Sequence, residues 1–194
     1  MLRNILTIFS FLFIFSVNSC QKAPDTKPQA ATGLEHLPQW VIDPSIEGKI
    51  AAVGMAPKSS GGVQFQIPQA EADARANIAA QINVEISRLT KNALREARVA
   101  GNDDVENVFT QVTKNVVKKI PLMGAKRVNM FRDITDGSLY IQMAIDNEMI
   151  SEYMKQNRRL ISNGLRKSDL PQKRINEAQR AVKELYEELD KEIK

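Results

Sequence analysis

The chain has 194 residues, and its 27 lysines and arginines outnumber its 23 aspartates and glutamates to give a formal net charge of +4. This excess is small and spread along the chain, which argues against nucleic-acid binding, because nucleic-acid binders concentrate basic residues on one face. Cys20 is the only cysteine, so the chain cannot form an internal disulfide. Hydrophobic residues make up 43% of the chain, which suffices for the core of one domain.

The N-terminus has the pattern of a secretion signal. Arg3 precedes an apolar run over residues 5–17. A membrane-spanning helix needs about 20 apolar residues, so this run is too short to cross a bilayer. A positive start followed by a short apolar stretch is typical of a cleaved leader. The sequence therefore predicts a signal peptide over residues 1–19.

The leader ends in Val17-Asn18-Ser19-Cys20, which resembles the lipobox of bacterial lipoproteins. This resemblance implies cleavage between Ser19 and Cys20, a diacylglycerol on the Cys20 thiol and a fatty acyl chain, such as palmitate, on the new amino terminus. Gln21 follows where an aspartate commonly retains such proteins in the inner membrane, so the resemblance favours the outer membrane. The alternatives are an ordinary secretion signal with an incidental cysteine, or a buried thiol.

Residues 20–36 are expected to form a tether between the lipid and the folded part. Pro24 and Pro28 lie among polar residues that cannot bury enough apolar surface to order the segment. His36, the only histidine, falls in this tether, which excludes a Ser-His-Asp triad in the domain.

The next segments predict a strand and two helices. The short apolar run at residues 49–56 is bounded by Gly48 and Pro57, which favours a strand. Pro68 is expected to open a long helix whose alanine-rich start can lie close to a sheet, and a second helix is expected over residues 103–119. The expected apolar stripes are Ala74, Ile78, Ile82, Ile86, Leu89 and Ala93 on the first helix and Val105, Val108, Val112 and Val116 on the second.

A hairpin follows, with strands expected at residues 125–133 and 138–146. Asp136-Gly137 between them is a strong turn signal, because glycine tolerates the positive φ that the turn requires. Leu139, Ile141, Met143 and Ile145 alternate on one face of the second strand. The sequence thus predicts an α+β fold, in which a small antiparallel sheet has long helices packed on one face.

Two more helices are expected at the C-terminus, over residues 147–163 and 169–193. The first is expected to stop at Asn163-Gly164, a typical helix end. The second has apolar positions in a narrow, coiled-coil-like seam. This seam must pack either on the same subunit or on a second subunit or envelope partner, so it is the candidate for self-association. Its members are Ile175, Ala178, Val182, Leu185 and Leu189.

The order of these motifs resembles the Lpp-twenty family of bacterial outer-membrane lipoproteins, which includes flagellum-associated members. The resemblance implies a small antiparallel sheet with helices on one face, no enzymatic activity, a family domain over residues 37–150 and a helical extension over residues 151–194. It rests on residues 38–41 (PQWV), 52–56 (AVGMA), 70–79 (AEADARANIA), 122–124 (LMG) and 136–140 (DGSLY).

The sequence offers no catalytic or metal-binding constellation and implies no cofactor. Asp103-Asp104 and Glu187-Glu188 are adjacent residues on helices, whose side chains point apart. Two functions are therefore expected. The first is a structural or assembly lipoprotein that contacts the membrane, envelope proteins and further copies of itself. The second is a membrane-tethered binding module for a small ligand or glycan, which the scarcity of aromatic residues disfavours.

Overall fold

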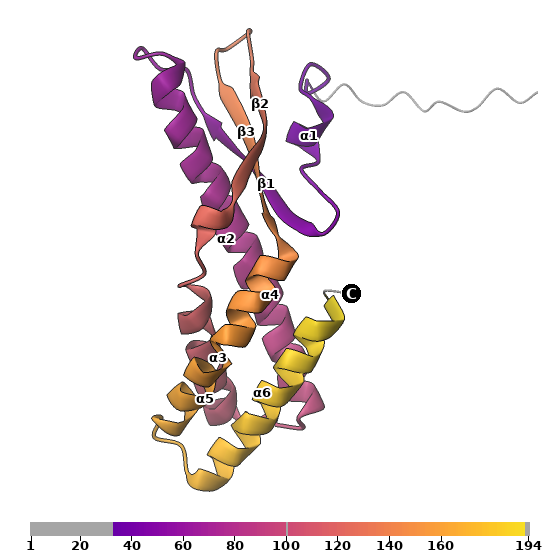
Figure 1. Ribbon diagram of the computed structural model, residues 1–194, viewed down its shortest axis with the longest axis vertical. Helices are drawn as coiled ribbons and strands as arrows, with labels where there is room; N and C mark the ends of the chain where they lie inside the picture. Colours follow the sequence, from indigo (N-terminus) through magenta and orange to yellow (C-terminus); the bar gives the residue numbers. More distant parts are fainter. Residues whose placement is uncertain (1–32, 100, 193–194) are drawn as a thin grey trace, which may run out of the picture. The chain divides into compact units, whose positions relative to one another are not determined.

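The computed structural model describes residues 33–99 and 101–192 (Figure 1). The predicted leader, the lipidation site Cys20, the cleavage residue Ser19 and the sorting residue Gln21 lie outside these residues. A compact unit begins at Leu34. The expected tether over residues 20–36 is therefore too long at its C-terminal end, because Leu34 and His36 already belong to the folded unit.

The described elements confirm the α+β class. Three strands form one antiparallel sheet in the order β1-β3-β2, so β3 is central and the other two strands are its edges. The elements, in chain order, are α1 (Gln39–Ile42), β1 (Lys49–Ala56), α2 (Val63–Glu96), α3 (Asp103–Val117), the 3₁₀ turn η1 (Leu122–Gly124), β2 (Lys126–Arg132), β3 (Leu139–Asp146), α4 (Asn147–Gln156), α5 (Arg158–Arg166) and α6 (Gln172–Glu192).

The first half of α2 packs on one face of the sheet at very short range (Figure 1). Gly54 of β1 lies directly under the helix, and a methyl group at this position would overlap the backbone of Ala70 and Ala74. Both alanines are fully buried. The absence of a side chain at Gly54 and the small ones on α2 therefore set the distance between helix and sheet, as the alanine-rich helix start predicted.

The expected core is confirmed. The α2 residues Ile78, Ile82, Ile86 and Leu89 are at most 4% exposed. The β3 residues that alternate on one face of that strand belong to the same buried cluster: Leu139, Ile141, Met143 and Ile145. On α3 the expected stripe is partly wrong. Val105 and Val116 are buried, but Phe109 and Thr113 lie between them on the buried side, and Val108 and Val112 lie at its margin.

The long helix α2 begins at Val63, five residues before Pro68, where we expected it to begin. Gly62 makes this start possible with a φ of 85°. The buried Gln66 side chain fixes the first turn, because its amide donates to the carbonyls of Pro57 and Gly137, both at 2.9 Å. Pro68 lies in the second turn, where it cannot donate the hydrogen bond that another residue would make to the Gln64 carbonyl.

The single helix expected over residues 147–163 is instead two helices, α4 and α5, which meet at Asn157. The Asn157 side-chain amide donates to the Tyr153 carbonyl at 2.8 Å. Gly164 lies inside α5 and does not cap it. A β-carbon at Gly164 would approach Val112 Cγ1 of α3 to 2.7 Å, so this glycine permits two helices to cross closely.

The boundary expected between a domain over residues 37–150 and an extension over residues 151–194 falls inside α4. The last helix, α6, packs on α2, α5 and α3 within one core. The Tyr186 hydroxyl donates to the Met154 carbonyl at 2.6 Å, and Arg158 lies 5.0 Å from the Tyr186 ring centre.

The α6 seam is buried in the same subunit, which is one of the two packings that the sequence allowed. Self-association through α6 would have to use another face of the helix. The seam residues Ile175, Ala178, Val182, Leu185 and Leu189 are each at most 8% exposed.

The buried stripe of α2 generates a stability prediction. Ile82→Ala should lower the free energy of unfolding by about 2–5 kcal/mol, because it removes a buried side chain and leaves a cavity. Lys91→Ala, on the exposed side of the same helix, should change it little. Urea denaturation of both variants measures the difference, and equal losses would show that the helix face is wrongly assigned.

Candidate functional site

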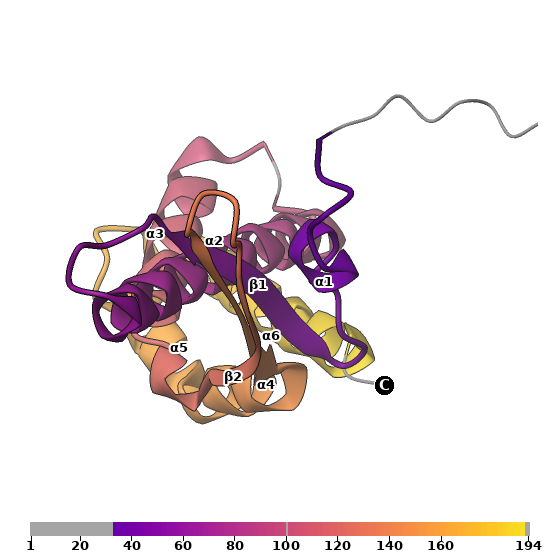
Figure 2. The same cartoon turned by 90° about the horizontal axis from the view of Figure 1, so that it is seen from above.

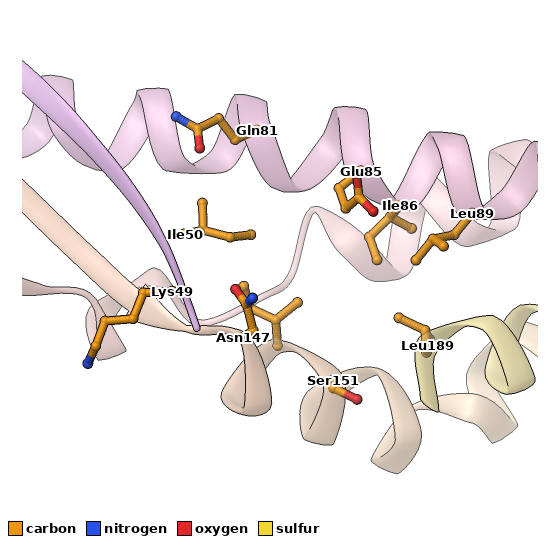
Figure 3. A pocket seen from close by; sticks show the side chains of 10 residues that line it. Lys49, Ile50, Gln81, Glu85, Ile86, Leu89, Asn147, Ser151 and Leu189 are labelled. Atoms are coloured by element: carbon orange, nitrogen blue, oxygen red, sulfur yellow. The ribbon is translucent and has the colours of Figure 1, made fainter. Parts of the chain in front are cut away.

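A cleft of about 310 Å³ opens where β1 begins, between α2, α4 and the last turns of α6 (Figure 3). Figure 3 shows α2 along one side of it and α4 along the other. This volume lies at the lower end of the range for ligand pockets, so only a small group would fit. The lining residues are Lys49, Ile50, Gln81, Glu85, Ile86, Leu89, Asn147, Ile150, Ser151 and Leu189.

Two polar atoms in this cleft lack partners among the described residues. Asn147 Oδ1 and Ser151 Oγ lie one turn apart on α4. Both are shielded from solvent, and neither takes part in a hydrogen bond. Buried polar groups are nearly always paired, so these two atoms are available to a group that enters the cleft. The walls are aliphatic, with Ile86, Leu89 and Ile150 buried.

The charges at the mouth of the cleft are already paired. Glu85 accepts hydrogen bonds from Arg88, and Lys49 Nζ lies 2.6 Å from Asp146 Oδ1. The Lys49 bond lowers the pKa of Asp146. The cleft thus suits an aliphatic group that carries a hydrogen-bond donor. In the described part of the chain, no three His, Cys, Asp or Glu side chains gather as metal ligands do.

The outer edge of β1 is closed by side chains of α2. Asp73 accepts a hydrogen bond from the Met55 amide at 2.9 Å. Asn77 and Gln81 donate to the carbonyls of Val53 and Ala51 at 2.9 and 3.2 Å. Residues 73, 77 and 81 are four apart, so they lie on one side of the helix. Edge groups satisfied in this way cannot pair with a further strand.

The outer edge of β2 is open by comparison. Within residues 33–99 and 101–192, no side chain hydrogen-bonds to the backbone of this strand across that edge. Six of its seven residues are exposed, among them Val128 at 47% and Met130 at 52%. A register shift between Arg127 and Asn129 makes Val128 a bulge. This strand is the one side of the sheet that another extended segment can reach.

The charges of β2 disfavour pairing with the same strand of a second copy. Lys126, Arg127 and Arg132 are all exposed cations. Antiparallel pairing of two identical strands about their centre would place Lys126 opposite Arg132, and like charges in opposing positions are destabilising. An extended segment with acidic residues would instead complement this strand.

His36 is held at the hairpin turn and does not lie in a tether. Its Nε2 lies 2.8 Å from Asp133 Oδ2. The other oxygen of Asp133 accepts hydrogen bonds from the backbone amide and the hydroxyl of Thr135. The Thr135 hydroxyl therefore binds the carboxylate and not the imidazole, so these groups do not form a catalytic triad.

The pKa of the Asp133 carboxyl is lowered from 3.8 to about 2, mainly because Thr135 donates two hydrogen bonds to it and secondarily because of His36. A carboxyl with a depressed pKa in the folded state stabilises the fold above its unfolded pKa. This stabilisation is lost as pH falls through the folded value.

Asp133→Asn should therefore destabilise the protein at neutral pH, and the difference from wild type should shrink as pH falls from 3.8 towards about 2. Urea unfolding of both proteins across this range measures the difference. The exposed Asp169→Asn serves as the control. A difference that stays constant down to the lowest pH would show that ionised Asp133 does not stabilise the fold.

The lipidation residues proposed from the sequence lie outside the described residues, and the seam residues are buried in the core. The cleft was missed by the sequence reasoning. Asn147 and Ser151 are four apart beside Ile150, but a polar pair at the edge of an amphipathic helix is too common to indicate a site.

In a comparison with protein-family models, residues 38–162 match the family described as LPP20 lipoprotein. The matched region reaches past the expected limit at residue 150 and includes α4 and the first half of α5. No curated protein matches the chain. Among the described residues, no helix is long and apolar enough to cross a membrane.

Proposed function

This chain belongs to the LPP20 lipoprotein family, whose model covers more than half of it, and we propose that it assembles an envelope structure through protein contacts while lipid on Cys20 holds it at the outer membrane. Cys20 in its lipobox and Gln21 in the sorting position support the anchor and its location. Flagellar association is the form of this role that the family resemblance suggests. We further propose that the protein works without catalysis.

The open edge of β2 is the observation that carries the assembly role. Its exposed Val128 and Met130 give apolar contacts, and its backbone offers hydrogen bonds to an added strand. The opposite edge of the same sheet is closed by Asp73, Asn77 and Gln81. A fold that blocks one edge and leaves the other accessible is suited to binding a partner on a single side.

A photo-crosslinking amino acid tests this role. Placed at Met130, it should give a discrete adduct with an envelope protein in intact cells, because the partner strand would lie against this edge. The same amino acid at Lys91, exposed on α2, should give no such adduct. Gel mobility after irradiation and mass spectrometry of the adduct provide the measurement.

Cys20→Ser supplies the second arm of this experiment. The substitution should abolish incorporation of a fatty-acid analogue and the Met130 adduct together, because the chain would no longer be anchored beside its partner. Equal fatty-acid labelling of wild type and variant would refute the anchor. Identical adducts at Met130 and Lys91 would refute a specific role for β2.

The cleft supports a second candidate function, the binding of a small ligand by a membrane-tethered module. The unpaired Asn147 Oδ1 and Ser151 Oγ favour it, because they would accept hydrogen bonds from a ligand with an aliphatic body. A glycan is a poorer candidate than an alkylamine or similar group, since no aromatic side chain is among the residues that line the cleft.

Hexylammonium chloride is a suitable probe of the cleft. It should raise the melting temperature of the wild type above the value in methylammonium chloride, because a ligand that binds only the folded state stabilises it. Ser151→Ala should remove this difference, whereas Ser162→Ala on α5 should keep it. An equal response of all three proteins would show that the cleft does not bind the probe.

A further inference from the structure

Three segments that are distant in sequence meet at one end of the folded unit, which we call the hairpin end: residues 34–37, the loop 57–62 with the first turn of α2, and the β2–β3 turn 133–138. His36 contacts Asp133, which joins the first segment to the turn. Gln66 donates to the Gly137 carbonyl at 2.9 Å, which joins α2 to it. Figure 2 looks down on this end.

Large apolar side chains project from the tips of the hairpin end. Ile134, in the turn itself, is 96% exposed, Phe65 in the first turn of α2 is 62% exposed, and Leu34 is 43% exposed. They come from three different segments, so no single local motif explains their exposure. Exposed large apolar side chains that gather at one end of a protein are typical of a surface that contacts another molecule or a membrane.

The opposite end of the folded unit is more highly charged. There, the turn between α2 and α3 and the turn between α5 and α6 present charged side chains, including Arg95, Arg98, Lys167 and Asp169, all exposed. The two ends therefore face different environments by their chemistry.

The hairpin end also contains the described residues that are nearest in sequence to the proposed anchor, Cys20. Cys20 precedes Leu34 by 14 residues, and a chain of this length spans at most about 3.3–3.6 Å per residue, or roughly 50 Å. The contact between His36 and Asp133 fixes the start of the folded unit beside the β2–β3 turn. A lipid on Cys20 thus keeps the apolar tips within reach of the bilayer that holds it.

We propose that the hairpin end docks on the leaflet that carries the lipid anchor, with Ile134, Phe65 and Leu34 in the interfacial region. The inference rests on the proposed anchor at Cys20. Each apolar side chain gains by leaving water for the acyl boundary, and a covalent anchor makes the weak insertion of a few side chains effective.

The charges around the tips indicate that insertion does not depend on anionic lipid. Lys58 and Arg132 lie near the β2–β3 turn together with Glu35 and Asp136, so the exposed charges nearly balance. Docking should therefore occur equally on neutral and anionic bilayers and should be insensitive to salt, because no net charge attracts the surface.

The full lipid-bearing chain, reconstituted into vesicles, tests the inference. Lipid occupies the Cys20 thiol, so Ile134→Cys creates a single free thiol that can carry the environment-sensitive dye NBD. On phosphatidylcholine vesicles, NBD at residue 134 should show blue-shifted emission and strong quenching by a lipid-borne spin label. NBD on Leu160→Cys, an exposed apolar position on α5, should show neither.

A second pair of variants removes the contribution of the dye itself. With NBD on Phe65→Cys, the added substitution Ile134→Glu should reduce the lipid quenching, whereas Leu160→Glu should leave it unchanged. The same results are expected with phosphatidylglycerol present and at raised salt.

The possible failures are distinguishable. Mass spectrometry reports whether the purified chain carries its lipid, and a chain without lipid would refute the anchor and this inference together. A lipid-bearing chain whose dyes at residues 134 and 65 stay in a water-like environment would overturn the inference alone, and would indicate that a protein covers the hairpin end. A response confined to anionic vesicles would overturn insertion of the apolar tips.

Discussion

The close contact between α2 and β1 at Gly54 is the constraint on which the rest of the structure depends. Because a methyl group there would overlap the backbone of Ala70 and Ala74, the helix lies against the sheet with almost no side-chain layer between them. The residues that follow on α2 then reach past β1 to its outer edge. The second half of the same helix extends beyond the sheet and provides the surface on which α6 and α3 pack. One long helix thus organises both halves of the folded unit.

This contact also makes the two edges of the sheet different. At so short a distance, Asp73, Asn77 and Gln81 can bond to the β1 backbone directly, and they close that edge. β2 lies on the far side of β3, where the Glu71 carboxylate of α2 lies 3.7 Å from Arg127 Nε. The accessible edge is therefore a consequence of where the helix crosses the sheet. Its position determines which side of the molecule a partner strand can approach.

Sequence patterns sufficed for the strands, the hairpin and the buried stripe of α2, because periodicity and an Asp-Gly turn are local signals. They failed where the same residue type has two uses. Gly164 follows Asn163 as a helix-ending glycine would, yet it serves the crossing of α5 and α3, which no local pattern reveals. Proline is common at the first position of a helix, so Pro68 predicted the start of α2. The helix instead starts upstream, where the Gln66 side chain donates to the Gly137 carbonyl, 71 residues away in sequence. The cleft depends on α2, α4, β1 and α6 together, so its unpaired atoms could not be found before the fold.

The contact between His36 and Asp133 fixes where the folded unit begins relative to the sheet. It joins residues 34–37, the described segment nearest in sequence to the proposed anchor at Cys20, to the β2–β3 turn. Farther along, the Gln142 side-chain amide donates to the Pro44 carbonyl at 2.8 Å on the sheet face opposite α2. The chain before β1 therefore contacts that face of β3, and α2 packs on the other. Because the β1 edge is closed, the β2 edge is the side of the sheet left for a partner strand. If the hairpin end docks on the membrane as proposed, a strand bound to the β2 edge would be held beside that membrane.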